Sequence, residues 1–229
     1  MALPDLAPCD WHDPVLELDA VLANTMEYEE KSIAMLLGRV DGFGIHQWNI
    51  GPAKEGIQVH YGDVKGSAWP AMKTNGLVHA SPERLVEVLQ PADAASKLDK
   101  FTKTAIVLDT LSTSMELRYF ETIGVLFVAP RDFCAATIRQ ELPDGRIVIA
   151  SRSIITKDCP KKNGYVRAQA LLSGYVITPI ANDPNTCSVC VFGHVDFGGS
   201  IPGSIVKMVG LSAPIKIFQN LRCLAMQTR

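Results

Sequence analysis

The second half of the chain carries strand-like segments in succession, followed by one long and nearly uncharged helical segment. The strand-like segments span residues 106–111, 113–120, 133–141, 146–155, 165–178 and 187–197. Strands that follow one another without intervening helices favour an antiparallel sheet. The helical segment runs from Ile201 to about Gln227, with Ser200 as a candidate cap and Pro202 in its first turn. We expect this apolar helix to cover one face of the sheet.

Two local signals refine this expectation. The sequence LPDGR at residues 142–146 is typical of a turn, so residues 133–155 should form an antiparallel hairpin. Pro214 lies inside the final helix and should kink it or divide it in two. A curved sheet closed by such a helix either fills its interior with side chains or leaves a cavity.

The first half of the chain is mixed. Apolar residues at near-helical spacing predict a helix from about Pro14 to Leu37, ended by Gly38 or soon after. Two or three short strands should follow, among them GIQVHYG and AMKTNGLVHA. Ser81 and Pro82 then begin a helix as cap and first residue, and residues 92–101 suggest another short helix. The fold class expected is therefore α+β.

Composition and charge limit the possible functions. The chain has 229 residues, of which 47% are hydrophobic and 20% charged, as in a globular protein. A net charge of −2 gives no general attraction to nucleic acid, so no nucleic-acid partner is expected. No apolar run approaches the roughly 20 residues that span a bilayer, and the N-terminus does not resemble a signal peptide. A cytoplasmic protein with a single domain over residues 1–229 is the simplest expectation.

The cysteines favour free thiols over a disulfide framework. They are Cys9, Cys134, Cys159, Cys187, Cys190 and Cys223. Cys187 and Cys190 lie three residues apart on an expected strand and should point to opposite faces. Such a pair cannot easily share a metal ion, so we expect neither a metal site nor a cofactor.

Three passages in the strand-rich half resemble the START (steroidogenic acute regulatory protein-related lipid transfer) family. They are Pro-Arg-Asp-Phe at 130–133, Val-Arg at 166–167, and Asp-Phe-Gly-Gly-Ser-Ile-Pro at 196–202. Their order and spacing are similar to those of the family over roughly residues 45–229. The segment GLVHASPERLVEVL also resembles the family's entry into its second helix.

The resemblance implies the helix-grip (START/Bet v 1-like) fold, in which a curved antiparallel sheet wraps around a long C-terminal helix. It implies an internal hydrophobic tunnel for one lipid, such as a sterol or phospholipid, and a noncatalytic activity in lipid binding or transfer. A lipid ligand, transient contact with a membrane surface and a monomeric state are the partners and assembly it suggests. Residues 45–229 would form the core, and residues 1–44 would be either part of the domain or an appended arm.

Two departures from the family pattern bear on the ligand. Members commonly carry Trp-Asp after the second short helix, where this chain has Leu98 and Asp99. The phosphatidylcholine-binding members have an Arg three residues earlier, where this chain has Ala95. The sterol-binding members pair a Glu with an Arg; Glu116 matches the Glu, but direct counting places Thr137 at the Arg position, with Arg139 two residues later.

Candidate ligand-binding residues come from the strands and from the final helix. They are Glu116, Arg118, Thr137, Arg139, Arg152, Ile205, Met208 and Val209. Alternation alone leaves open which of the strand residues face inward. An inward arginine would need an anionic or polar ligand group, or an internal partner. Arg139 is the leading candidate for a headgroup contact.

The segment TIGVLFVAP at residues 122–130 is an apolar loop candidate, with an ordinary buried strand extension as the alternative. In START proteins the corresponding loop gates the tunnel together with the last helix. Val125, Leu126 and Phe127 are the candidate gate and membrane contacts.

Four charged residues are expected to have structural roles. Arg131 and Asp132 should pair to hold the loop before their strand. Arg167 and Asp196 lie on neighbouring expected strands and could form an ion pair.

Two other functions remain open on the same architecture. An enzyme such as a cyclase or hydrolase would need titratable side chains that converge in the cavity, for instance His194 with Asp196 or Glu116. A lipid-sensing module would change partners when its tunnel fills. No catalytic residue is identified from a nucleophile or phosphate-binding motif.

Overall fold

The computed structural model describes residues 15–125, 127–199, 201 and 203–227, without the side chains of residues 203–212. Ser200 and Pro202, the expected cap and first-turn residues of the last helix, lie outside the described residues. The same holds for Pro14, where the first helix was expected to begin.

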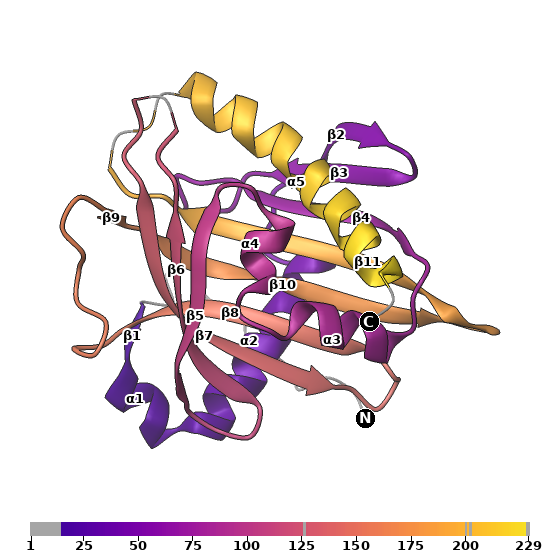
Figure 1. Cartoon of the computed structure of the whole chain (residues 1–229), viewed down its shortest axis with the longest axis horizontal. Coiled ribbons are helices and arrows are strands. Elements are labelled where there is room, and N and C mark those ends of the chain that lie inside the picture. The colour runs from indigo at the N-terminus through magenta and orange to yellow at the C-terminus, as the bar shows by residue number, and fades with distance from the viewer. Residues whose placement is uncertain (1–14, 126, 200, 202, 228–229) are drawn as a thin grey trace.

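A single large sheet dominates the described part of the chain (Figure 1). Its strands are β1 (Leu16–Glu17), β2 (Asn49–Lys54), β3 (Ile57–Gly62), β4 (Ala71–Val78), β5 (Thr102–Thr110), β6 (Met115–Thr122), β7 (Arg131–Glu141), β8 (Ile147–Ile155), β9 (Val166–Arg167), β10 (Gln169–Ile180) and β11 (Asp183–Asp196). The main path runs β2-β3-β4-β11-β10-β8-β7-β6-β5, and neighbours on it are antiparallel. Two short parallel pairings, β1 with β8 and β9 with β7, lie off this path.

Helices cover both faces of the sheet. They are α1 (Leu18–Ala23), α2 (Thr25–Val40), α3 (Pro82–Leu89), α4 (Ala94–Leu98) and α5 (Gly203–Met226). In Figure 1, α3, α4 and α5 lie in front of the sheet, while α2 crosses behind it. We name the two sides the α5 face and the α2 face. The expected α+β helix-grip architecture, a large antiparallel sheet with a long C-terminal helix, is confirmed.

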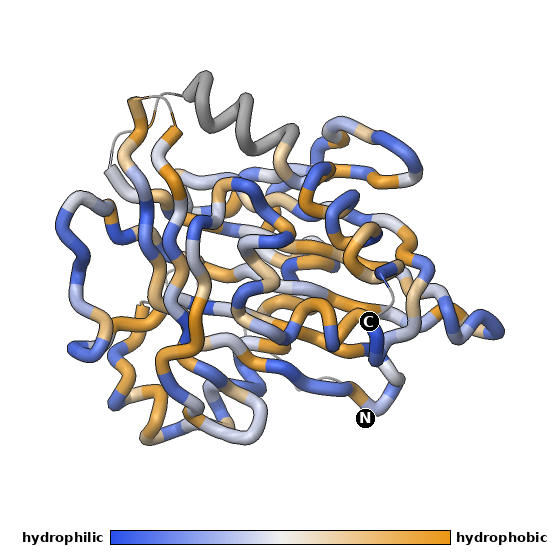
Figure 2. The backbone as a smooth tube through the Cα atoms, viewed as in Figure 1, coloured by the Kyte–Doolittle hydropathy of each residue, from blue (hydrophilic) through white to orange (hydrophobic). Residues whose placement is uncertain are grey.

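Each covered face has its own hydrophobic core, because successive strand residues point to opposite sides. On β8, Val148 and Ala150 belong to the core under α2, whereas Ile147 and Ile149 belong to the core under α3 and α5. Figure 2 shows hydrophobic residues along the central strands and on the helices over them. Both sides of the central strands are therefore buried.

The cysteine pair on β11 follows the same rule. Cys187 lies in the core of the α5 face, and Cys190 lies in the core of the α2 face. The expectation that the two side chains point to opposite faces is confirmed.

The predicted helix from Pro14 to Leu37 is wrong in its first part. The chain forms the short strand β1, then α1, and α2 begins only at Thr25. Asn24 has non-helical dihedral angles of −138° and 51°, and its N–H donates to the carbonyl of Val21 at 3.2 Å. This tight turn separates the two helices. The second of them then packs on β7, β8, β10 and β11 as part of the same fold.

Other local predictions have mixed outcomes. The hairpin around LPDGR is confirmed, with Leu142 and Arg146 closing the turn and Gly145 at a φ of 82°. Ser81 caps α3 by accepting from the N–H of Arg84 at 3.3 Å, as expected. The segment 165–178 is not one strand: Val166–Arg167 pairs with β7, and β10 begins only at Gln169.

None of the helices among the described residues is long and apolar enough to cross a membrane.

Candidate functional site

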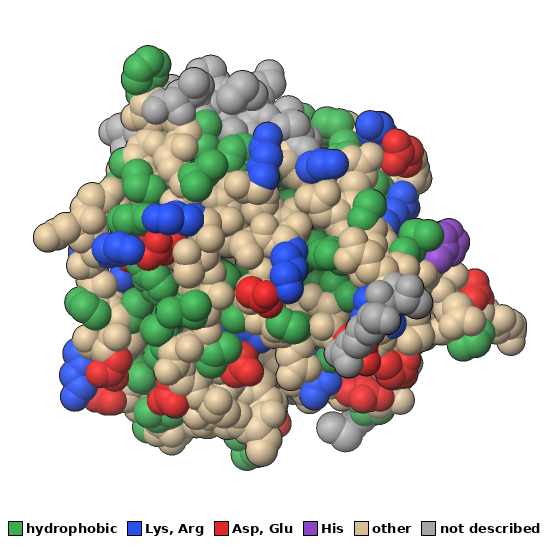
Figure 3. All heavy atoms as spheres, viewed as in Figure 1, with side chains coloured by type: hydrophobic (Ala, Val, Ile, Leu, Met, Phe, Trp, Pro, Cys, Tyr) green, Lys and Arg blue, Asp and Glu red, His purple; other side chains and the backbone are tan. Residues whose placement is uncertain are grey.

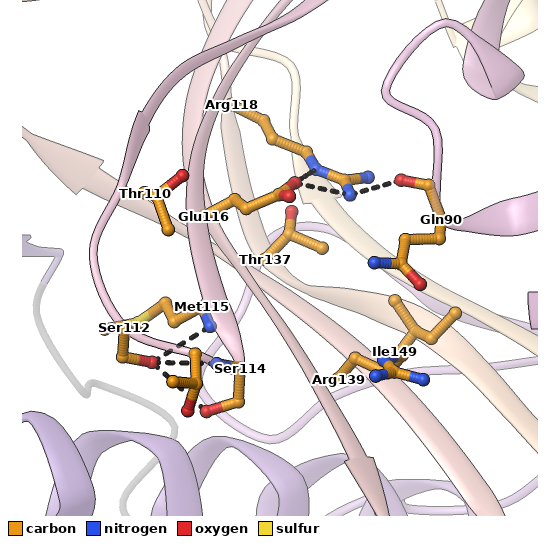
Figure 4. Close-up of a pocket in the computed structure, with 11 residues that line it drawn as sticks. Gln90, Thr110, Ser112, Ser114, Met115, Glu116, Arg118, Thr137, Arg139 and Ile149 are labelled. Carbon is orange, nitrogen blue, oxygen red and sulfur yellow. Dashed lines mark hydrogen bonds and ion pairs between the residues drawn. The ribbon is translucent and has the colours of Figure 1, made fainter.

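A small polar pocket opens on the α5 face, where the ends of β6 and β7 meet the turn after α3 (Figure 4). Its cavity volume is about 70 Å³. Residues from β5, the β5–β6 turn, β6, β7, β8 and the end of α3 line it: Thr110, Ser112, Thr113, Ser114, Met115, Glu116, Arg118, Thr137, Arg139, Ile149 and Gln90. Four of the residues predicted from the sequence as ligand contacts are therefore brought together here.

Glu116 and Arg118 form the wall of this pocket. They face α5 because the alternate residues Met115 and Leu117 are held in the core under α2. Arg118 donates from Nε to Glu116 at 2.8 Å and from Nη2 to the main-chain carbonyl of Gln90 at 2.5 Å (Figure 4). The buried guanidinium therefore has a carboxylate and a main-chain carbonyl as acceptors, and its bond to Gln90 links the turn after α3 to β6.

Gln90 is the contact that sequence reasoning missed. It is the C-terminal cap of α3, where the last carbonyl groups of a helix lack partners within the helix. Pro91 follows directly and cannot continue such hydrogen bonding as a donor. A helix end followed by a proline indicates that a main-chain carbonyl such as that of Gln90 lacks a partner within the helix. The sequence does not reveal that Arg118 is the donor.

Thr137 and Arg139 occupy the opposite wall on β7. Thr137 is buried, pairs in register with Glu116, and shares a hydroxyl hydrogen bond of 2.9 Å with Ser151. Arg139 is exposed at the mouth of the pocket beside Ile149, its register partner on β8. Among the described residues, no side-chain hydrogen bond or ion pair holds the Arg139 guanidinium.

Arg152, which the sequence predicted as a ligand contact, does not line this pocket. It lies on the α2 face with Val148, Ala150 and Ile154, because it shares their parity on β8. Its guanidinium lies 5.1 Å from the centre of the Tyr28 ring and donates to Ser32 at 3.3 Å. Both partners are on α2, so Arg152 attaches that helix to β8.

The side chains of Ile205, Met208 and Val209 lie outside the described part of α5. The second half of α5 is described and is firmly attached. Phe218 and Leu221 are fully buried in the core of the α5 face. Arg222 donates to the carbonyls of Leu77 and Glu55, both at 2.8 Å.

Arg84 on α3 closes the far end of the same helix. Its guanidinium donates to the carbonyls of Leu224 and Ala225, both at 3.2 Å, and to that of Gln227 at 2.6 Å. These are the carbonyl groups that a helix end leaves unpaired. The C-terminal half of α5 is therefore fixed to both the sheet and α3.

The loop at residues 122–130 is a tight turn with an exposed apolar tip. Val125 and Val128 exchange two main-chain hydrogen bonds of 3.1 and 2.9 Å. Phe127 is 100% exposed and Ile123 is 44% exposed. Leu126 lies outside the described residues. The alternative of a buried strand extension is excluded for Phe127.

Arg131 connects this loop to the chain that enters α5. Its guanidinium donates to the carbonyl of Ala129 in the loop, and to those of Phe197 and Gly198, both at 3.2 Å. The expected pairing of Arg131 with Asp132 is wrong, because neighbouring strand residues point to opposite faces. Burial lowers the pKa of Arg131, and its guanidinium is hydrogen-bonded to three carbonyl oxygens.

Asp132 instead pairs with Arg167, at 3.0 and 2.9 Å from its two oxygens. The expected pair of Arg167 with Asp196 is therefore also wrong. The reason is topological: Arg167 lies on β9, which runs parallel to β7 and places it beside Asp132. Asp196 accepts from the N–H of Gly198 at 2.7 Å and so shapes the exit from β11.

His194 and Glu116, one of the two pairs that an enzyme would need, do not converge. His194 is buried on the α2 face, with Phe192 and Cys190 of the same parity, and its Nε2 lies 2.9 Å from the Ser67 hydroxyl and 3.1 Å from the Trp69 carbonyl. Glu116 faces the opposite side of the sheet. Burial, with a smaller contribution from the charge of Arg39, lowers the pKa of His194 to about 4.

Comparison with known proteins gives a consistent picture. The model of the START domain family matches residues 46–227. StAR-related lipid transfer protein 5 of Bos taurus is 22% identical over 163 residues, covering 69% of this chain and 76% of that protein. Its Mus musculus counterpart is 21% identical over 202 residues, covering 86% and 93%.

Among solved structures, human StAR-related lipid transfer protein 5 has the same fold. Its TM-score is 0.79 at 20% sequence identity, and the match covers 90% of this chain and 97% of that one. Since the family model spans well over half of the sequence and the solved structure shares the architecture, this chain belongs to the START domain family.

Proposed function

We propose that this chain binds one lipid molecule between its sheet and α5, and transfers it between membranes without chemical conversion. Relatives that match over most of their length are named as lipid transfer proteins, which supports this choice.

The observation that carries the proposal is an apolar part of the α5 face outside the packed cores. Phe120 on β6 and Phe133 on β7 are register partners there, and both are only half-buried. Among the described residues, neither belongs to the two core clusters. The main packing partners of α5 are β2, β3, β4, α3 and α4. The three strands among them lie at the opposite end of the strand order from β6 and β7.

An acyl chain or sterol ring against these phenylalanines supplies affinity without many polar contacts. Each methylene removed from water contributes about 0.8 kcal/mol. The polar pocket at Glu116, Arg118 and Thr137 lies farther along the same strands and suits the ligand's polar end. The proposed lipid therefore lies along β6 and β7.

Contact with the membrane is assigned to the loop at residues 122–130. Its tip places Phe127 and Ile123 in solvent, where apolar side chains gain by entering a bilayer. Arg131 ties the base of this loop to Phe197 and Gly198 just before α5. Movement of the loop on a membrane would then loosen the start of the helix and open the site.

The test is lipid exchange between donor and acceptor vesicles, with native mass spectrometry to detect a bound lipid. The Phe127→Ser variant should fold normally, retain bound lipid and transfer it several-fold more slowly. Met26→Ser is the matched control, because Met26 is 74% exposed on α2, on the other side of the sheet. A wild-type protein that neither holds nor exchanges any lipid of a broad panel would overturn the proposal.

A further inference from the structure

The charge inside the polar pocket is not balanced. Its lining includes three charged side chains, those of Glu116, Arg118 and Arg139. Glu116 and Arg118 form an ion pair at 2.7 Å, and Arg118 also donates a hydrogen bond to the Gln90 carbonyl. The two charges cancel, and the positive charge of Arg139 remains.

This excess is a property of the pocket and not of the surrounding surface. Figure 3 shows acidic and basic side chains interspersed over this side of the molecule. Glu29 on α2, outside the pocket lining, accepts from the Ser112 and Ser114 hydroxyls at 2.5 and 2.8 Å. Both oxygens of this carboxylate are therefore engaged by donors from the β5–β6 turn.

The arrangement suits a compact acidic group. A guanidinium offers two parallel donors that match the oxygens of a carboxylate or a phosphate ester. Hydroxyls of Thr137, Thr110 and Thr113 line the same space and can complete its hydrogen bonding. A cavity of about 70 Å³ has room for an acidic group of a few atoms.

We propose that the lipid bound by this chain is an amphiphile with a single acidic oxygen group, which Arg139 receives at the mouth of the polar pocket. This inference rests on the proposed lipid-binding function and names the ligand class. Because Arg139 is partly solvated, its contribution should be modest and should weaken as salt is added.

The experiment compares binding of oleate with that of oleyl alcohol, which has the same tail and no charge. The wild-type protein should bind oleate more tightly, and the preference should shrink between low and high salt. Arg139→Gln should weaken oleate binding about fivefold and leave oleyl alcohol unchanged. Arg139→Lys should retain part of the preference, because it keeps the charge and loses the paired donors.

Arg146→Gln is the matched control, since Arg146 is another arginine at the β7–β8 end and pairs only with Asp144 in the turn. It should bind both probes as the wild type does. Equal binding of the two probes, or an unchanged Arg139→Gln, would overturn the inference and leave lipid binding intact. Failure of both probes to bind would overturn lipid binding of such ligands altogether.

Tailless acids distinguish a lipid site from a general anion site. Acetate and inorganic phosphate should displace oleate only at concentrations far above that of oleate, because the tail supplies most of the affinity. Displacement by either ion at the concentration at which oleate itself binds would show an ion site and overturn the assignment to a lipid.

Discussion

The ring of Phe218 on α5 rests directly against Gly76 on β4. A Cβ atom at Gly76 would lie 2.9 Å from two ring carbons of Phe218, closer than such atoms approach in proteins. Phe218 is fully buried, so the ring has little freedom to move away. The missing side chain on β4 is what lets the last helix approach the sheet.

Gly76→Ala should therefore lower the free energy of unfolding by about 1–3 kcal/mol, as overpacked cores do. Gly193→Ala on the adjacent strand β11 is the control, because a Cβ there meets no atom within 4 Å. That variant should change stability by less than about 0.5 kcal/mol. Urea unfolding measures the free energy of unfolding of both variants. Equal losses in Gly76→Ala and Gly193→Ala would show that the contact with Phe218 does not limit the position of the helix.

The ion pair of Asp132 and Arg167 provides a second prediction. The Asp132 side chain is 1% exposed and that of Arg167 is 17% exposed. Arg167→Leu leaves a buried carboxylate without its partner and should cost about 3–5 kcal/mol. The exposed pair of Arg146 and Asp144 serves as the comparison, and Arg146→Leu should cost less than about 1 kcal/mol. Similar losses in both variants would contradict the difference in burial.

Sequence reasoning succeeded where the signal is local. Ser81 and Pro82 define the start of α3 because a cap acts within one turn of its helix. The turn at LPDGR sets the β7–β8 register through its own hydrogen bonds. The family motifs added the helix-grip architecture, which composition and periodicity alone could not supply.

The same reasoning failed where distant pairing decides. Alternation groups Arg152 with Ala150 and separates both from Ile149, but only the position of α2 shows which group lies on which face. The partner of Arg167 depends on β9 pairing with β7 in parallel. A strand of two residues such as β9 is too short to show an alternating pattern in the sequence, so Asp132 could not be identified as the partner of Arg167.

The buried His194 predicts how stability depends on pH. Burial, with a smaller contribution from the charge of Arg39, lowers its pKa from 6.5 to about 4 in the folded protein, against the opposite effects of the Trp69 hydrogen bond and the charge of Asp196. The unfolded chain therefore binds the proton more readily, and stability falls as the pH drops from 6.5 towards 4. The full difference is about 3 kcal/mol, of which about 2 kcal/mol is lost by roughly pH 5.

Urea unfolding at about pH 7.5 and about pH 5 measures this loss. His194→Gln should remove most of the difference between the two pH values, whatever its own stability. His46→Gln, at an exposed position, should keep the wild-type difference. A His194→Gln protein with the wild-type pH dependence would assign the acid sensitivity to other groups.

Pro214 lies inside α5, which runs as one helix from Gly203 to Met226 and is not divided in two at the proline. Proline has no N–H to donate to the Gly210 carbonyl, so the helix is weakest at this point. Pro214→Ala should raise the free energy of unfolding by about 1–3 kcal/mol and slow lipid transfer between vesicles several-fold, because a continuous helix opens less easily. Lys216→Ala, at an exposed position two residues nearer the anchored end, should leave transfer unchanged. Transfer that is unchanged or faster in Pro214→Ala would show that opening does not hinge at this residue.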